Sequence, residues 1–168
     1  MTSVNDFIQN FNIGGRANLY QVEIIGVDGI DEKVKYHCKA AQVPGKTVSP
    51  IEVRYLSHII KVAGDPIFDD WTATIQHDED HEIRTGLDDW QQKIMANDDA
   101  IGEDDLNNYF KQIKISQLKR NGDVNADGIY TLHNAWPTTI DPMDLGFDNT
   151  DTILEYGVTF AYTHWVKG

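Results

Sequence analysis

The sequence has very little cysteine: Cys38 is the only one in 168 residues. A single cysteine excludes an internal disulfide and a zinc site with several cysteine ligands. Cys38 lies where polar and apolar residues alternate along the chain. We therefore expect a small buried side chain at this position, with a reactive thiol as the alternative.

Basic residues are also scarce. The chain has 27 acidic residues against 14 lysines and arginines, which gives a formal net charge of −13. Such a surface repels phosphate and argues against a protein dedicated to binding nucleic acid. It suits a soluble protein, a protein with a basic partner, or a surface that nucleic acid must pass without sticking.

Long apolar runs are missing. No stretch of the sequence approaches the roughly 20 apolar residues that a membrane helix needs. Residues 1–6 lack the basic and apolar regions of a secretory signal. We therefore expect synthesis in a cytoplasm and no membrane insertion by this chain. Hydrophobic residues make up 40% of the sequence and no repeat or linker divides it, which predicts one globular domain over residues 1–168.

The sequence contains no complete motif for catalysis or cofactor binding. It lacks a nucleophile elbow, a phosphate loop and a dinucleotide fingerprint, so we predict no catalytic residue, no metal and no cofactor. His77 and His81 are spaced so that they could share a helix face and bind zinc. However, the zincin motif needs Glu directly after the first His, where this chain has Asp78. We favour a solvated helix start, with a zinc hydrolase as the alternative.

Residues 123–128 begin like a calcium-binding loop. The twelfth position of such a loop should be a bidentate Glu, but here it is Asn134. The pair Asp127 and Gly128 also favours a tight hairpin turn between two strands, which is the interpretation we prefer. The more distant alternative is a calcium-assisted carbohydrate-binding β-sandwich that uses the oxygen-bearing residues Asp123, Asn125 and Asp127.

Alternation of apolar and polar residues is the dominant pattern. Because successive side chains of a strand point to opposite faces, each alternating run predicts a strand with one buried face. The predicted strands are Leu19–Ile25, Val34–Ala40, Ile51–Leu56, His58–Ala63, Trp71–Ile75, Phe110–Lys119, Ile129–Trp136 and a long C-terminal strand, Ile153–Val166. This pattern predicts an all-β protein with one helix, built as an antiparallel sandwich or barrel of roughly seven to nine strands.

One segment has helical spacing instead. Ile83, Leu87, Trp90 and Ile94 recur at the period of one helix face, and acidic residues precede them, which suits the positive end of a helix dipole. We predict a helix from about Asp80 to Met95, followed by an acidic loop. Gly86 lies inside this helix and lowers its intrinsic propensity.

Short motifs in matching order then indicate a family. They are Asn18–Glu23, Cys38–Ala40, Lys61–Asp65, Phe68–Thr72, Asp89–Gln91 and Trp136–Thr138. Together they resemble the tail tube proteins of contractile-tailed, myovirus-type bacteriophages, over nearly the whole chain. The sequence departs most from that family in Asn97–Asn108 and around Arg120–Asp127.

The resemblance implies a structural virion protein and not an enzyme. Hexameric rings would join their sheets into one continuous inner β-barrel and stack into the tail tube. The implied partners are other copies of the chain, the tail sheath protein, baseplate and tail terminator proteins, a tape-measure protein in the lumen and passing DNA that is not specifically bound. The family's loop for contacts between subunits and rings maps to an extended stretch here: Val43, Pro44, Gly45, Lys46, Thr47, Val48, Ser49, Pro50 and Ile51.

Two further expectations follow. The acidic helix region is expected to meet a basic sheath surface through Glu79, Glu82, Asp88 and Asp89. The long C-terminal strand would be costly as an exposed edge, which favours pairing across subunits. The nearest alternative family is the tube protein of a type VI secretion system or of an extracellular contractile injection system.

Overall fold

The structure is a computed structural model that describes residues 4–10, 14–98 and 101–168. In chain order its elements are α1 (Val4–Asn10), β1 (Tyr20–Ile25), α2 (Val34–His37), β2 (Cys38–Ala41), β3 (Thr47–Tyr55), β4 (His58–Ile67), β5 (Trp71–Gln76), α3 (Glu82–Ile94), α4 (Leu106–Tyr109), β6 (Lys111–Leu118), β7 (Val124–Ile140), β8 (Glu155–Ala161) and β9 (His164–Lys167). No helix within these ranges is long and apolar enough to span a membrane.

Antiparallel pairing connects the strands of the body in the order β1-β6-β7-β8-β5-β2, with β9 also paired to β7. The long strand β7 serves two layers: its first half pairs with β6 and β9, and its second half pairs with β8. An irregularity in the register lies around Asn134, which has a φ of +57° and marks the place where the strand changes layer. The predicted antiparallel β-rich fold is therefore confirmed.

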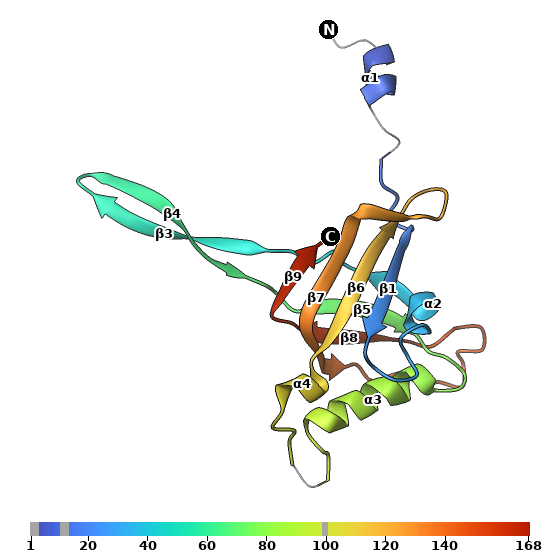
Figure 1. Ribbon diagram of the computed structural model, residues 1–168. Coiled ribbons are helices and arrows are strands. Elements are labelled where there is room, and N and C mark those ends of the chain that lie inside the picture. Colours follow the sequence, from blue (N-terminus) through green and yellow to red (C-terminus); the bar gives the residue numbers. More distant parts are fainter. Residues whose placement is uncertain (1–3, 11–13, 99–100) are drawn as a thin grey trace.

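The core fills the space between the two layers, and α3 closes one end of it (Figure 1). Alternate strand residues point inward, as the period of two requires. They include Val22, Ile24, Ile113, Ile115, Leu132, Trp71, Ile75, Val158 and Phe160, all of them buried. Helix α3 adds Ile83, Leu87 and Trp90. The predicted helix is confirmed within two residues at each end.

The prediction of one helix is wrong, because the described residues form four. The segment Val34–Ala40, predicted to be a strand, begins as the helical turn α2 and becomes strand only at Cys38. The reason is the pair Ile30 and Val34, which are both buried and four residues apart, with the Val34 amide donating to the Ile30 carbonyl at 3.1 Å.

The long C-terminal strand is also interrupted. Residues 162 and 163 separate β8 from β9, which turns away to pair with β7. Phe160 is buried in β8, whereas in β9 it is Trp165 that packs against the core, so the inward phase shifts by one residue between them. A continuous alternation in the sequence hides such a shift.

The hairpin turn predicted at Asp127 and Gly128 is misplaced. Both residues lie inside β7, and the chain reverses at residues 119–123 instead. There Gly122 has a φ of +89°, and the Lys119 amide donates to the Asp123 carbonyl at 2.8 Å. The residues weighed as calcium ligands are thus spread along a turn and a strand, and no group of three candidate metal ligands exists among the described residues.

Candidate assembly interfaces

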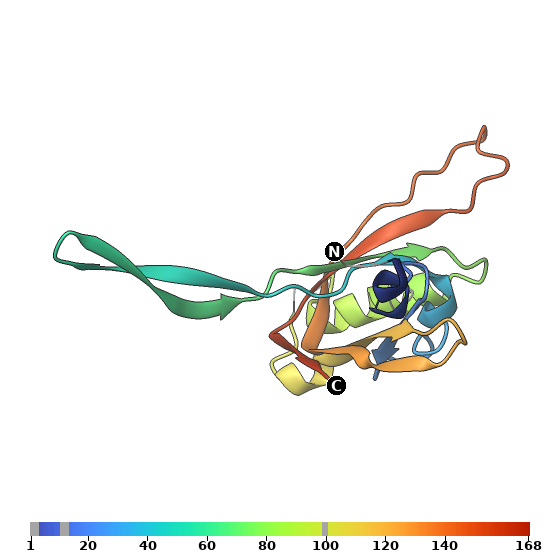
Figure 2. The same cartoon turned by 90° about the horizontal axis from the view of Figure 1, so that it is seen from above.

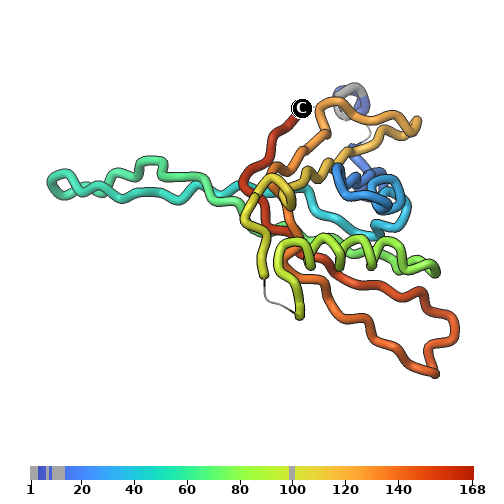
Figure 3. Tube along the Cα trace, turned by 60° about the horizontal axis from the view of Figure 1, so that its bottom comes forward, coloured from blue at the N-terminus to red at the C-terminus, as the bar shows by residue number. Residues whose placement is uncertain are grey.

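Strands β3 and β4 form an arm that projects from the body (Figures 1, 2 and 3). We call Thr47–Ile67 the arm. Within the described part of the chain its two strands pair only with each other, and nearly every residue in them is exposed. An isolated two-stranded ribbon is marginally stable in water. The arm therefore carries a surface that the body of the same chain does not cover.

The two faces of the arm differ in chemistry. Cross-strand pairs Ile51–Val62 and Val53–Ile60 share one face with Tyr55. The register pair Glu52–Lys61 lies on the other face, where the two side chains form an ion pair of 3.8 Å. Val53 and Ile60 are 47% and 49% exposed, which is unusual for paired apolar residues in the middle of a ribbon. One face of the arm is therefore apolar and uncovered.

The tip of the arm continues this apolar surface. Leu56 is 88% exposed and has a φ of +53°, a left-handed conformation that costs an L-residue with a bulky side chain roughly 1–2 kcal/mol. Gly or Asn would fit the turn better and would be more soluble. Leu56 therefore exposes a large apolar side chain in a turn whose backbone conformation favours Gly or Asn.

The predicted contact segment Val43–Ile51 straddles the root of the arm. Its first residues are fixed to the body: Pro44 is buried, and the Trp165 indole donates to the Gly45 carbonyl at 2.9 Å. The Trp71 indole holds the preceding Gln42 carbonyl at 2.6 Å. The last residues of the segment, from Thr47, already belong to β3. Sequence reasoning therefore missed most of the exposed apolar surface, which lies beyond Ile51 and was predicted to be ordinary half-buried strand.

Helix α3 and the turn before it carry the predicted acidic surface. Two of its four candidates are engaged within the chain: Glu82 pairs with Lys33, and Asp88 accepts from the Arg84 guanidinium at 3.2 Å. The other two, Glu79 and Asp89, are exposed and have no ion-pair partner within the described ranges. The four acids lie close together in the chain, but only these two present unneutralised charge.

The start of α3 is set by Asp78, which is buried. Its carboxylate Oδ2 accepts from the Glu82 amide at 2.9 Å and the Ile83 amide at 3.3 Å, so it satisfies two donors of the first helical turn. The N-cap position is His81, whose side chain makes no capping hydrogen bond, so among the acidic residues at this helix start it is Asp78 that accepts from the first-turn amides.

The two ends of one body layer are open edges. In the described chain β1 pairs only with β6, and β9 pairs only with β7, so each leaves one side of its backbone without a strand partner. Inside the layer a row of register partners runs across the face opposite the core: Glu23, Lys114, Thr131 and Val166. This row contains one acidic residue and one basic residue.

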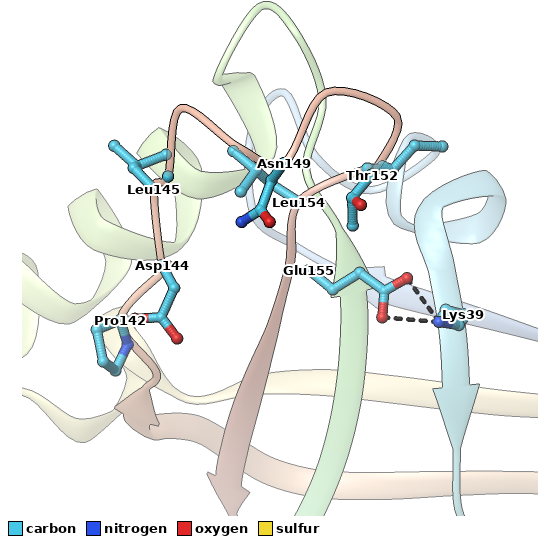
Figure 4. Close-up of a pocket in the computed structure, with 10 residues that line it drawn as sticks. Lys39, Pro142, Asp144, Leu145, Asn149, Thr152, Leu154 and Glu155 are labelled. Carbon is cyan, nitrogen blue, oxygen red and sulfur yellow. Dashed lines mark hydrogen bonds and ion pairs between the residues drawn. The ribbon is translucent and has the colours of Figure 1, made fainter.

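A hollow of about 620 Å³ lies beneath the loop between β7 and β8 (Figure 4). Its one ion pair joins Lys39 and Glu155 at 2.6 Å, and this contact together with a Gln76 hydrogen bond lowers the pKa of the exposed Glu155 carboxyl. The other labelled side chains come from the loop itself, including Asp144, Leu145 and Asn149.

Comparison with known proteins identifies the family of the chain. Residues 4–167 match the family described as phage tail tube protein. The chain is 32% identical to tail tube protein gp19 of Enterobacteria phage T4, over 96% of this chain and 98% of that protein.

Solved structures share the fold. A chain in the sheath-tube complex of an extracellular contractile injection system, PVC, has a TM-score of 0.67 and 17% identity, covering 100% of this chain and 99% of that one. A sheath/tube terminator of such a system has a TM-score of 0.66 and 16% identity, covering 92% and 96%. Identity at this level establishes fold similarity alone. The family match and the phage relative, by contrast, span nearly the whole chain, and the chain belongs to the phage tail tube protein family.

Proposed function

We propose that six copies of this chain close into a ring and that rings stack into the inner tube of a contractile phage tail. The arm is the observation that carries this proposal, because an apolar ribbon held away from its own body requires another molecule to cover it. In a tube, the molecule that covers the arm is a second copy of the chain. The role is structural, and the chain does no chemistry of its own.

Ring closure would use the open edges β1 and β9. Pairing β1 of one copy with β9 of the next would satisfy both free backbones and join the layers into a closed barrel without edges. The row of Glu23, Lys114, Thr131 and Val166 would then face the lumen. The row carries one carboxylate, on Glu23, which lies 3.9 Å from Nζ of Lys35, and one ammonium, on Lys114. We therefore expect this part of the lining to hold DNA weakly through neutrality and not through strong repulsion.

Stacking would use the arm. Within Thr47–Ile67 two acidic residues, Glu52 and Asp65, balance two basic residues, Arg54 and Lys61, in a chain whose net charge is −13. The arm can therefore approach the acidic body of another copy without the repulsion that two bodies experience. Its apolar face supplies the attraction, and its charged face stays toward water.

The test compares the two faces of the arm. Val53→Thr with Ile60→Thr makes the apolar face polar, and β-branched Thr keeps the strand propensity. We expect a folded chain by circular dichroism but no rings or tubes by negative-stain electron microscopy. The matched control, Glu52→Thr with Lys61→Thr, changes the neighbouring register pair on the opposite face and should still form tubes. Normal tubes from the first variant would refute the role of the arm.

The tail of a phage is favoured over an injection device because the relative with higher identity is a phage tail tube protein. In that setting we infer synthesis in the host cytoplasm and assembly from a baseplate, with a tape-measure protein in the lumen and a terminator at the far end. DNA would pass through the finished tube. We also infer that the sheath contacts α3 at its unneutralised acids, Glu79 and Asp89.

A further inference from the structure

The connection from β5 to α3 brings two imidazoles together. Nε2 of His77 lies 3.3 Å from Nε2 of His81, and the ring centroids are 4.2 Å apart at an interplanar angle of 73°. His77 follows the last residue of β5, and its amide donates to the Leu154 carbonyl at 2.8 Å, which fixes its backbone to the body. His81 precedes the first residue of α3 and is exposed.

The separation of the two nitrogens matches that of ligands on one metal ion. Zinc binds imidazole nitrogen at about 2.0–2.1 Å with tetrahedral geometry, which places two such nitrogens about 3.3 Å apart. Two rings pointing at one ion need their centroids somewhat farther apart than 4.2 Å. Because His81 is exposed, a rotation of its side chain can increase the distance between the two ring centroids without disturbing the core.

The surroundings keep the pair available to a cation. Burial, followed by the neighbouring His81 ring, lowers the pKa of His77, and Arg84 acts in the same direction against the opposing carboxylate of Asp78. The Nδ1 atom of His77 is buried without a hydrogen-bond partner among the described residues, whereas its Nε2 lies within hydrogen-bond distance of Nε2 of His81. An ion held between the two Nε2 atoms would replace that contact. The intervening residues, Glu79 and Asp80, are exposed acids that raise the local concentration of cations.

We propose that His77 and His81 chelate one divalent transition-metal ion of the zinc, nickel or copper type, with water in the remaining positions. Imidazole suits these ions, whereas magnesium and calcium prefer oxygen ligands. The ion would join the end of β5 to the start of α3. It would therefore fix the entry of the helix to the sheet, next to the cap that Asp78 already provides. This site is independent of ring assembly.

The test is titration of the purified, tag-free chain with Zn²⁺ at about pH 7.5, because metal binding competes with protons for the imidazole nitrogens. We expect one ion per chain by calorimetry and a rise in the thermal midpoint, because an ion that binds only the folded state stabilises it. Mg²⁺ should produce neither effect. X-ray absorption at the zinc edge should show two imidazole ligands.

Two variants and one control decide the assignment. His81→Asn keeps a residue that tolerates the φ of +57° at this position, and His77→Gln removes the other ligand. Each should weaken Zn²⁺ binding by at least about tenfold. The control is His133→Gln with His164→Gln, which removes a stacked pair of rings with centroids 4.9 Å apart and should leave binding unchanged. Undiminished binding in folded His81→Asn, or no binding by the unaltered chain, would overturn the proposal.

Discussion

At the scale of single residues, Gly86 marks the closest approach of α3 to the core. A Cβ atom at this position would lie 2.5 Å from Cγ2 of Ile30, which is itself buried. Gly inside a helix normally lowers stability by about 1 kcal/mol relative to Ala. Here the missing side chain allows the helix to pack against Ile30. This close contact explains why a glycine, which lowers helix propensity, lies inside α3.

We predict that Gly86→Ala destabilises the chain although it raises helix propensity. Overpacking costs about 1–3 kcal/mol, and only about 1 kcal/mol is regained from propensity. Urea unfolding should show the loss, whereas Thr85→Ala, on the exposed side of the same helix, should change little. Adding Ile30→Ala removes Cγ2, so the two changes should be less than additive. A more stable Gly86→Ala variant would contradict the close contact.

Cys38 makes stability depend on pH. Burial raises the pKa of its thiol from 9.0 to about 11. Below pH 9 the thiol is neutral in both folded and unfolded chains, so it contributes no difference. Between pH 9 and about 11 the unfolded thiol ionises while the folded one does not, and stability falls.

We therefore expect the urea midpoint to fall as pH rises through this window. In Cys38→Ser the fall should be smaller, because the hydroxyl does not ionise there. The difference between the two pH profiles isolates the thiol from tyrosines such as Tyr156, whose pKa burial raises to about 12. Identical profiles would show that Cys38 titrates normally. The sequence had suggested a buried residue, and the structure places it half-buried at the start of β2.

At the scale of elements, the sequence predicted what local periodicity determines. The period of 3.6 located α3 because its buried face is continuous. The period of two located most strands, but it did not separate β8 from β9, since a phase shift at a break looks like continued alternation. It also did not distinguish β3 and β4 from body strands. An alternating strand can pack on its own chain or on another chain. The two-residue alternation of apolar and polar residues is the same in both cases.

The charge on α3 gives a prediction for this element. Glu79→Lys with Asp89→Lys reverses the two exposed acids without breaking the internal pairs of Glu82 and Asp88. We expect tubes to form but sheath assembly around them to weaken, measured by co-sedimentation with the sheath protein. Reversal of Asp123 and Asp127 is the control, because the β6–β7 turn and the start of β7 lie at the opposite end of the body from α3 (Figure 1). Unchanged sheath assembly in the α3 variant would exclude this contact.

At the scale of the whole molecule, net charge opposes assembly. Each copy carries −13, so six copies in a ring repel one another. The Debye length falls from about 30 Å at 0.01 M salt to about 8 Å at 0.15 M. We therefore predict that the critical concentration for tube formation falls over this range, measured by light scattering. A critical concentration that rises with salt would show instead that ion pairs between copies dominate.

The arm also has a consequence for direction. In the proposed stack, the arm of one copy and the surface that receives it are different patches, so the contact is heterologous and does not close on itself. Such a filament is polar: its two ends are chemically distinct, and a protein that caps one cannot cap the other. Each added ring covers one set of arms and exposes an identical set. Growth is therefore energetically the same at every step, and the filament contains no internal measure of its own length.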